Sequence, residues 1–167
     1  MGAAHNPLST RHVAPGAVPW FGDLEGLYER WTQLGRQAQI IGPHGTGKST
    51  LLAHLVARAA RDRIAVVALD DADVRSPLRA RWARFRHRYL LITTHSDLGL
   101  PTLSRTRISL ECARAVILHL LRAHPGFVPD DRDLERLLAA HDGNLREVLF
   151  ALYDRIELSA TRRPARE

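Results

Sequence analysis

The stretch that decides the fold lies between residues 42 and 49 and reads Gly42-Pro43-His44-Gly45-Thr46-Gly47-Lys48-Ser49. It matches the pattern G-x-x-x-x-G-K-[ST] without a gap. An apolar segment, residues 38–41, precedes it, and residues 49–60 follow it with apolar side chains at helical spacing. Because a strand, a glycine-rich turn and a helix in this order are the context that the pattern requires, we interpret the stretch as a phosphate-binding loop.

Each residue type in this loop has a physical task. The glycines let the backbone turn tightly and bring its N–H groups against phosphate oxygens, and the following helix points the positive end of its dipole at the same anion. We expect Lys48 to reach the β- and γ-phosphates of a nucleotide, Ser49 to ligate Mg²⁺ and Thr50 to contact the α-phosphate. We interpret His44 as a variable loop position rather than a catalytic histidine. The predicted nucleotide-binding residues are Gly42, Pro43, His44, Gly45, Thr46, Gly47, Lys48, Ser49 and Thr50.

The positive charge of the chain comes almost wholly from arginine. The 167 residues include 24 lysines and arginines against 18 acidic residues, a formal net charge of +6, and Lys48 is the only lysine. A basic chain attracts polyanions without specifying which one. Guanine-specific proteins commonly read the base with an Asn-Lys-x-Asp element, which a chain with no second lysine does not contain. The sequence therefore predicts ATP rather than GTP as the ligand.

Three absences in the sequence bear on where the chain acts. No run of about 18 apolar residues is present, which argues against a membrane-spanning helix. Residues 1–20 lack the apolar stretch of a signal peptide. Cys112 is the only cysteine, so no internal disulfide forms, as is usual in a reducing compartment. We expect a cytoplasmic location and no membrane partner.

An acidic strand end is the second element of the predicted site. Residues 64–69 form a continuous apolar run, typical of a strand buried on both faces of a parallel sheet, and Asp70 and Asp71 follow it. We expect Asp70 to hold Mg²⁺ and Asp71 to orient the attacking water, although aspartate is one methylene shorter than the glutamate that is usual at the second position. The alternative is a solvated turn in which Asp71 and Asp73 cap the next helix.

The spacing between the two motifs leaves two interpretations open. Only 22 positions separate Lys48 from Asp70 (70 − 48 = 22). Another strand and helix commonly lie between such elements. Either the sheet is reduced to a minimum, or residues 64–69 are that intervening strand and the true acidic strand is missing. The second case would leave a nucleotide binder with poor hydrolysis.

The rest of the chain alternates helix and strand signals up to about residue 110 and is helical beyond it. A predicted strand at 89–93 ends before Thr94, which we expect near the γ-phosphate or the attacking water. The other predicted elements are a helix from Asp23 to about Leu34, a basic helix at 76–88 and an edge strand at 105–110. Three helices follow, at 110–123, from Asp130 or Asp131 to about Ala140, and at 145–158.

The basic segment 75–88 holds six arginines, with Leu78, Trp82 and Phe85 between them. Such a stripe can neutralise the phosphates of a nucleic acid. The other interpretation is a solvated helix face whose apolar side chains face inward and pack in the core. The absence of a recognised nucleic-acid-binding motif favours the second interpretation, so a nucleic-acid partner is not preferred here. A protein partner and a homo-oligomer both stay open.

The order of elements predicts the fold class and the division of the chain. Strand, loop, helix, strand, helix, strand indicates an α/β domain with three layers and a short, mostly parallel sheet. The helices without strands that follow indicate a separate helical lid. We divide the chain into an extended arm (1–21), a core with the phosphate-binding loop (22–108), a helical lid (109–158) and a frayed tail (159–167).

With these residues in hand, the chain resembles the AAA+ class of P-loop NTPases and, more narrowly, small bacterial proteins known only as ATP-binding. Besides loop 42–50, residues 6–11 (Asn-Pro-Leu-Ser-Thr-Arg) and 100–103 (Leu-Pro-Thr-Leu) carry the resemblance, which covers roughly residues 6–158. The resemblance implies the three-layer fold of P-loop NTPases with a carboxy-terminal helical lid.

One element of the predicted lid adds to this resemblance. Residues 143–146, Gly-Asn-Leu-Arg, are similar to the sensor 2 motif of AAA+ lids, in which an arginine reaches back to the γ-phosphate. Arg146 is the matching residue; the alternative is a surface arginine near a helix start. Arg105 and Arg107 are candidates for an arginine finger by position only.

Taken together, these features predict a slow, Mg²⁺-dependent ATPase whose lid moves with the γ-phosphate. The predicted catalytic residues are Asp71, Thr94 and Arg146, and the predicted metal ligands are Ser49 and Asp70. A nucleotide-binding switch or scaffold with negligible turnover is one alternative, and a small-molecule kinase is another. The sensor-like lid element favours the ATPase and the switch over the kinase.

Overall fold

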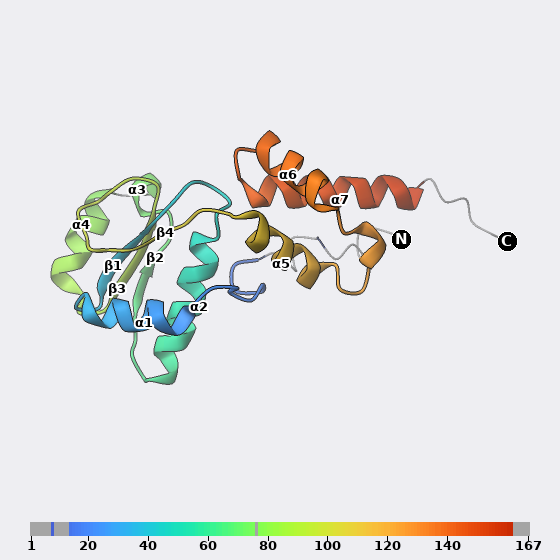
Figure 1. The fold of residues 1–167 in the computed structure, drawn as a ribbon. Coiled ribbons are helices and arrows are strands. Elements are labelled where there is room, and N and C mark those ends of the chain that lie inside the picture. Colours follow the sequence, from blue (N-terminus) through green and yellow to red (C-terminus); the bar gives the residue numbers. More distant parts are fainter. Residues whose placement is uncertain (1–7, 9–13, 76, 162–167) are drawn as a thin grey trace. The chain divides into compact units, whose positions relative to one another are not determined.

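The computed structural model describes residue 8, residues 14–75 and residues 77–161. The chain divides into two compact units, of which one spans Trp20–Arg107 and the other combines Met1–Pro19 with Ile108–Glu167. The first is an α/β unit and the second is helical (Figure 1). Within the predicted arm and tail, residues 1–7, 9–13 and 162–167 lie outside the described residues.

The α/β unit is built on a four-stranded sheet in which every neighbouring pair of strands is parallel. The strand order is β2-β3-β1-β4. The strands are β1 (Gln37–Ile41), β2 (Val67–Leu69), β3 (Leu90–Thr94) and β4 (Thr102–Arg105). The helices are α1 (Leu24–Gln33), α2 (Lys48–Arg61), α3 (Ala72–Arg75) and α4 (Pro77–Arg86). This confirms the predicted α/β class with a parallel sheet.

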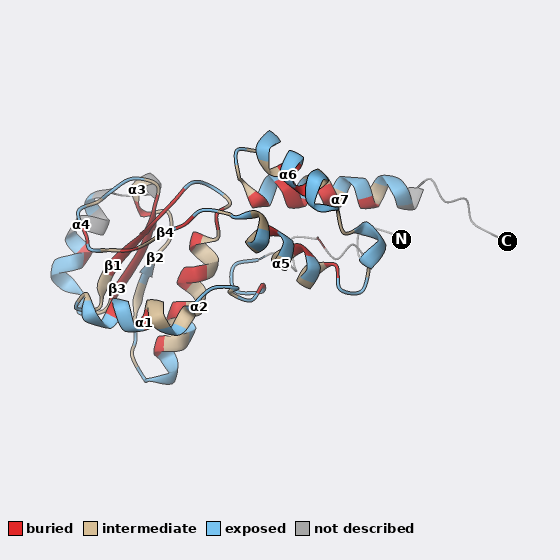
Figure 2. Ribbon diagram, viewed as in Figure 1, coloured by how far each residue is buried: buried red, intermediate tan, exposed pale blue. Residues whose placement is uncertain are grey.

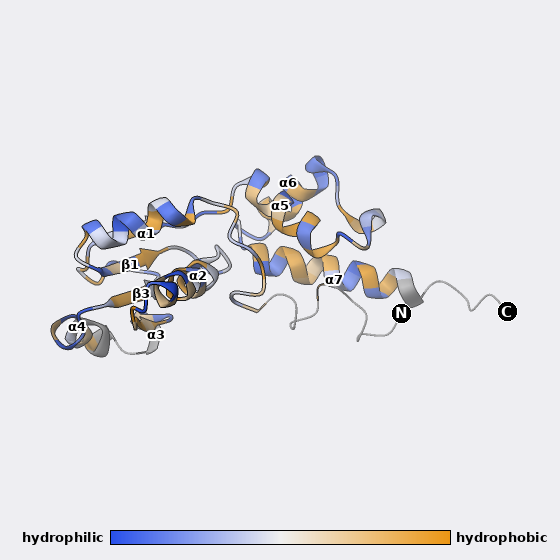
Figure 3. Cartoon of the chain, turned by 90° about the horizontal axis from the view of Figure 1, so that it is seen from below, coloured by the Kyte–Doolittle hydropathy of each residue, from blue (hydrophilic) through white to orange (hydrophobic). Residues whose placement is uncertain are grey.

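Helices cover both faces of the sheet. On one face, α1 and α2 pack against β1, β3 and β4 in a core that includes Trp31, Leu55 and Leu91. On the other face, α3 and α4 pack against Leu90 and Ile92 of β3. Because successive side chains of a strand point to opposite faces, β3 contributes to both cores and is buried throughout. Figure 3 shows α1 on one side of the strands and α3 and α4 on the other.

The strand β2 is shorter and more exposed than the sequence predicts. The apolar pattern predicts a strand buried on both faces over residues 64–69, but only Val67–Leu69 is a strand, and Ala68 is exposed. The reason is its place at the edge of the sheet, where it pairs with β3 alone. Ile64 and Val66 pack against the core of α1 and α2 instead. An apolar run therefore identifies residues that pack against the core, but it does not show which of them belong to the strand and which belong to the segment before it.

The other edge strand lies earlier in the chain than predicted. The sequence predicts it at 105–110, whereas β4 ends at Arg105 and pairs in parallel with β1. Leu103 anchors β4, since its side chain is fully buried in the core. The loop before β4 is held by the buried amide of Gln39, which donates to the carbonyl of Leu100 (2.6 Å) and accepts from the N–H of Leu98 (3.0 Å).

The outward face of α4 contradicts the expectation of an inward apolar stripe. Leu78, Trp82 and Phe85 are 69%, 67% and 73% exposed. Among its described side chains, α4 buries the small Ala83 against the sheet, and the amide of Gln37 donates to two backbone carbonyls at the end of the helix. Helical spacing identifies an apolar stripe but not whether another element covers it. Figure 2 shows how much of α4 is exposed.

The helical unit has one apolar core. Ser109 and Asp130 cap its first two long helices, because their side-chain oxygens accept backbone N–H groups of the first turns. Leu8 is buried in the same core. The last helix ends at Thr161, beyond the predicted end at residue 158. No helix of the described residues is long and apolar enough to cross a membrane. The elements are α5 (Leu110–Leu120), a 3-10 turn (Pro125–Phe127), α6 (Asp131–Ala140) and α7 (Leu145–Thr161).

Replacing Gln39 by leucine should destabilise the α/β unit. The substitution removes the amide that pairs the buried Leu100 carbonyl and the Leu98 N–H. Each buried polar group left unpaired costs about 1–3 kcal/mol, so we expect the free energy of unfolding to fall by about 2 kcal/mol or more. Urea denaturation measures this. As a control, Gln33→Leu on the exposed side of α1 should change it by less than about 0.5 kcal/mol. An equally small effect of Gln39→Leu would contradict the role given to this amide.

Candidate functional site

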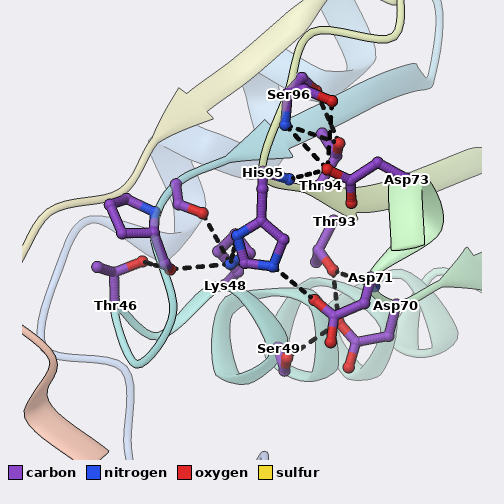
Figure 4. A network of polar contacts seen from close by, with 12 residues as sticks. Thr46, Lys48, Ser49, Asp70, Asp71, Asp73, Thr93, Thr94, His95 and Ser96 are labelled. Carbon is purple, nitrogen blue, oxygen red and sulfur yellow. Dashed lines mark hydrogen bonds and ion pairs between the residues drawn. The ribbon is translucent and has the colours of Figure 1, made fainter. Parts of the chain in front are cut away.

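Three loops meet at one edge of the sheet because parallel strands end at the same edge. The glycine-rich loop (residues 42–49) follows β1, Asp70 and Asp71 follow β2, and His95 follows β3. The central position of β3 places its end between the other two. Figure 4 shows these side chains gathered at the amino-terminal end of α2. The outer ends of parallel strands are where α/β proteins commonly bind ligands.

The glycine-rich loop has a backbone that only glycine adopts freely at two positions. Gly45 and Gly47 have φ angles of 68° and 85°, in the left-handed region, and Gly47 directly precedes α2. Gly42 is required for a different reason. A Cβ atom there would lie 2.2 Å from Oγ1 of Thr106, so the loop and the end of β4 approach too closely for any side chain.

Thr106 is a residue of the site that sequence reasoning missed. Its hydroxyl lies 2.7 Å from that of Thr46, which also donates to the carbonyl of Pro43 (2.9 Å). Both threonines are buried. These bonds tie the middle of the loop to the segment after β4. Nothing in the local sequence could have identified Thr106, because the contact joins residues 60 positions apart.

The side chain of Lys48 lies across the inside of the loop. It is only 5% exposed, and its amine donates to the carbonyls of Gly42 (2.8 Å) and Pro43 (2.9 Å). A buried ammonium is costly unless it is hydrogen-bonded, and the loop carbonyls satisfy part of this need. The single lysine of the chain is therefore held at the centre of the loop, beside the first turn of α2.

Asp70 and Asp71 lie near Lys48, and the hydroxyl of Thr93 bonds to both residues. Ser49 donates from Oγ to Oδ1 of Asp70 (2.9 Å), and Thr93 donates from Oγ1 to the same oxygen (2.5 Å). The N–H of Asp71 in turn donates to the hydroxyl of Thr93 (2.8 Å). The acidic strand end therefore adjoins the glycine-rich loop, as the interpretation of a reduced sheet requires.

The hydroxyl that contacts the acidic pair belongs to Thr93 and not to the predicted Thr94. Neighbouring residues of a strand point to opposite faces, so only one of the two threonines can face Asp70. The hydroxyl of Thr94 donates to the carbonyl of Ser96 (2.7 Å) and accepts from its N–H (3.2 Å), which closes a turn after β3. The role predicted for Thr94 stays a prediction, and Thr93 joins the candidate residues.

His95 is a second residue that sequence reasoning did not select. Its Nδ1 lies 3.4 Å from the amine of Lys48, and its Nε2 lies 3.4 Å from Oδ1 of Asp71. The exposed His44 covers it, with ring centroids 4.0 Å apart. Asp71 itself has a φ of 49°, an uncommon conformation that aspartate tolerates better than most residues. The imidazole of His95 thus stands between the cation and the second carboxylate of the site.

Asp73 lies in the first turn of α3 and fastens the loop after β3. Its Oδ2 accepts from the N–H of His95 (2.8 Å), the N–H of Ser96 (3.0 Å) and the hydroxyl of Ser96 (3.2 Å). Partial burial raises the pKa of Asp73, but the hydrogen bonds to its carboxylate, first of all those from the N–H groups of His95 and Ser96, together lower it, so its pKa lies below the usual 3.8. The carboxylate of Asp73 thereby holds His95 in place.

Trp20 packs against the outer side of the loop. A Cβ atom on Gly47 would lie 3.6 Å from Cζ3 of the Trp20 indole. The indole Nε1 is buried, and within the described residues it has no hydrogen-bond partner.

Three arginines are predicted to contact the nucleotide, and the structure shows the surroundings of each within its own unit. Arg146 is exposed in the first turn of α7, where the side chain of Asn144 accepts its backbone N–H (3.1 Å). Arg105 lies 3.9 Å from a carboxylate oxygen of Asp97, and Arg107 is exposed. The predicted roles of Arg146 as a γ-phosphate sensor and of Arg105 or Arg107 as a finger stay predictions.

Comparisons with known proteins do not assign this site. No protein-family model matches the sequence, and no curated protein shows a significant match to it. In the part of the chain that the structure describes, no group of three or more His, Cys, Asp or Glu side chains is arranged to hold a metal ion. Any function given to the site therefore rests on its own geometry.

The stability contributed by Asp73 should depend on pH. Because its pKa in the folded protein is below the unfolded value near 3.8, the stabilisation is fully present above that value and is lost as the pH falls through the lowered pKa. We expect Asp73→Asn to lower the free energy of unfolding by about 1 kcal/mol at neutral pH, since bonds to a charged acceptor are stronger. The difference from the wild type should shrink below pH 3.8.

Denaturation curves recorded across a range of pH measure this difference. Asp154→Asn, on the exposed side of α7, is the matched control and should leave the stability nearly unchanged throughout. A difference between wild type and Asp73→Asn that stays constant into strong acid would show that the charge of Asp73 does not hold the loop.

Proposed function

We propose that this protein binds ATP with Mg²⁺ at the glycine-rich loop and hydrolyses it slowly. The observation that carries the proposal is the buried amine of Lys48, held inside a loop with two left-handed glycines, next to the contact between Ser49 and Asp70. A bound triphosphate needs a cation, a helix amino terminus and oxygen ligands for Mg²⁺, and these groups lie together at one edge of the sheet.

Two features of the loop support the proposed phosphate site. The first N–H groups of α2 have no acceptor within the helix, and they stand at the end where the helix dipole is positive. The amine of Lys48 already lies within the loop, bonded to the carbonyls of Gly42 and Pro43. Exchanging these neutral acceptors for anionic phosphate oxygens would give it stronger, charge-assisted bonds. Thr50, one residue further along α2, is placed for the α-phosphate in the same proposal.

The oxygen atoms beside Lys48 fit Mg²⁺. Ser49 Oγ and Asp70 Oδ1 are 2.9 Å apart, and both are hard ligands of the kind that this ion prefers. Mg²⁺ commonly takes only one or two protein oxygens together with phosphates and water, so a larger cluster of carboxylates is not needed. Ser49 and Asp70 would hold the ion, which when bound neutralises charge on the phosphates. Thr93 keeps the carboxylate of Asp70 oriented.

The proposed hydrolysis rests on Asp71 as the group that orients the attacking water. Its carboxylate lies beside Nε2 of His95, at 3.4 Å, and its backbone is fixed by the bond to Thr93. Thr94 and Arg146 complete the proposed catalytic set. We expect slow turnover, because the short side chain of Asp71 gives little reach toward a water above the loop, and positioning carries much of the rate in phosphoryl transfer.

The proposal also includes the nucleotide and the family. The absence of any lysine besides Lys48 leaves no guanine-reading element of the common type, which favours ATP. A P-loop NTPase fold of AAA+ type, with α5 to α7 as the lid, accommodates the parallel sheet and the helical unit that are present. A nucleotide-binding switch without turnover and, less favoured, a small-molecule kinase remain the alternatives, since both would use the same loop.

Lys48→Ala should weaken ATP binding by about 10- to 100-fold, since a hydrogen bond to a charged group contributes about 1.5–3 kcal/mol. Isothermal titration calorimetry with MgATP measures the affinity. Arg61→Ala is the control, because Arg61 is an exposed cation at the other end of α2 and should leave the affinity unchanged. Circular dichroism checks that Lys48→Ala keeps its fold. Equal affinities of the wild type and Lys48→Ala would remove the basis of the proposed function.

The wild type should hydrolyse ATP more slowly than about 1 s⁻¹, the lower end of common phosphoryl-transfer rates, and removal of Mg²⁺ by EDTA should abolish turnover. Asp71→Asn keeps the uncommon backbone conformation but removes the charge. We expect it to lower the rate by about 100-fold while the ATP affinity stays within a factor of two or three. A phosphate-release assay measures both proteins.

Asp142→Asn is the matched control for this rate measurement. Asp142 is another exposed aspartate with a positive φ, 51°, but it lies in the helical unit. It should leave turnover unchanged. ATP binding without detectable turnover in the wild type would favour the switch over the ATPase, and fast turnover in Asp71→Asn would exclude Asp71 as the water-orienting group.

A further inference from the structure

The helix α4 carries an apolar face that the protein does not use for its own core. Leu78, Trp82 and Phe85 are each more than two-thirds exposed, at 69%, 67% and 73%. They are spaced four and three residues apart, so they lie along one side of the helix. We call these three side chains the α4 face. Scattered single apolar residues on a surface need no explanation, but two aromatic rings one turn apart indicate a contact surface.

The sequence around the α4 face carries positive charge only. Residues 74–96 contain six arginines and two histidines but no aspartate or glutamate. Arg84, Arg86 and Arg88 are exposed. The guanidinium of Arg84 lies over the ring of Phe85, 4.8 Å from its centroid, and that of Arg88 lies 5.6 Å from the centroid of Tyr89.

These arginines differ from others in the chain by their lack of acidic partners. Elsewhere, Arg58, Arg114 and Arg155 each form an ion pair with a carboxylate. Within the described residues, no ion pair involves Arg84 or Arg86. No described carboxylate therefore neutralises their charge, which is available to an anionic partner.

The helix is held firmly enough to serve as a platform. Ala83 is buried against the sheet, and the amide of Gln37 donates to the carbonyls of Arg84 (2.9 Å) and His87 (2.7 Å). Gln37 begins β1, so this end of α4 lies near the amino ends of the strands. The candidate nucleotide site lies at the carboxyl ends. The carboxyl-terminal end of α4 is thus at the other end of the strands from that site.

We propose that the α4 face binds a single-stranded nucleic acid. Exposed aromatic rings offer a surface on which unpaired bases stack, and arginines beside them contact the phosphates. Stacking needs no particular base, so the binding is tolerant of sequence. The exposure of Trp82 and Phe85 contradicts the part of the solvated-face interpretation that packs these two rings in the core. A duplex, whose bases are already stacked, would use the arginines but not the rings.

The first test compares aromatic variants for binding to fluorescein-labelled (dT)20, measured by fluorescence anisotropy at about 50 mM salt. The double variant Trp82→Ala/Phe85→Ala should bind at least about tenfold more weakly than the wild type, since each stacked base contributes substantially. The double variant Trp82→Phe/Phe85→Tyr should keep most of the affinity, because it keeps both rings. Leu118→Ala/Phe150→Ala, which alters apolar side chains of the helical unit that are 45% and 44% exposed, should bind like the wild type.

The second test addresses the charge. Replacing Arg84 and Arg86 by glutamine should weaken binding and make it less salt-dependent. The logarithm of the affinity falls linearly with the logarithm of the salt concentration, and each single-strand phosphate that the protein neutralises adds about 0.7 to the steepness of this line. The variant should therefore show a shallower line than the wild type. Arg122→Gln/Arg132→Gln, which removes two exposed arginines of the helical unit, is the control and should leave the slope unchanged.

Three outcomes would overturn the proposal. The first is no binding of either (dT)20 or (rU)20 at about 50 mM salt. The second is that the wild type binds a 20-base-pair duplex as tightly as (dT)20, or that Trp82→Ala/Phe85→Ala binds (dT)20 as tightly as the wild type. Either result would show that charge alone accounts for the binding. The third is binding of an acidic amphipathic peptide at Trp82 with no binding of the oligonucleotides, which would assign the face to a protein partner. Tight binding of (dT)20 or of (rU)20 that depends on the rings supports the proposal, and their ratio shows which nucleic acid is preferred.

Discussion

The candidate site depends on the parallel pairing of β1 with β3, which runs from Gln37 opposite Leu90 to Ile41 opposite Thr94. The pairing extends into the glycine-rich loop, because the N–H of Gly42 donates to the carbonyl of Thr94 (3.2 Å). On the other side of β1, the N–H of Thr106 donates to the carbonyl of Ile41 (2.8 Å). A glycine-rich turn alone has great conformational freedom. Here the backbone at the start of the loop is hydrogen-bonded on both sides, to the end of β3 and to the residue after β4. Gly42 is therefore fixed between the ends of these two strands.

Small hydroxyl groups organise the charges that this pairing brings together. Thr93 and Ser49 both donate to Asp70, and Thr46 meets Thr106 inside the loop. A hydroxyl can donate and accept at once, so it can join a carboxylate to a backbone N–H, as Thr93 does between Asp70 and Asp71. The result is a site in which one cation and two carboxylates lie close together, with their positions set by neutral groups.

The two positively charged regions of the α/β unit are built on different chemistry. The loop uses the one lysine of the chain, a compact charge that is buried and has carboxylates nearby. The α4 face presents exposed aromatic rings. Arginines lie beside it, and the surrounding sequence contains no carboxylate. A planar guanidinium stacks on rings and binds phosphate in two-pronged fashion, whereas an ammonium acts as a point charge. The carboxyl-terminal end of α4 lies near the amino ends of the strands, whereas the loop follows the carboxyl end of β1.

The sequence by itself determined the parallel α/β class, the glycine-rich loop between β1 and α2, and the start of α1 after Asp23. The loop and the helix start follow from backbone conformation and capping, which are local, and the fold class follows from the order of strand and helix signals along the chain. Only the tertiary structure decided that Thr93 rather than Thr94 contacts Asp70, because that depends on which face of the sheet α2 covers, and Ser49 of α2 binds the same carboxylate. It also decided that β2 is an edge strand and that the apolar stripe of α4 is uncovered. Helical spacing reports which residues share a face, but burial requires a second element to pack against it, and that element comes from elsewhere in the chain.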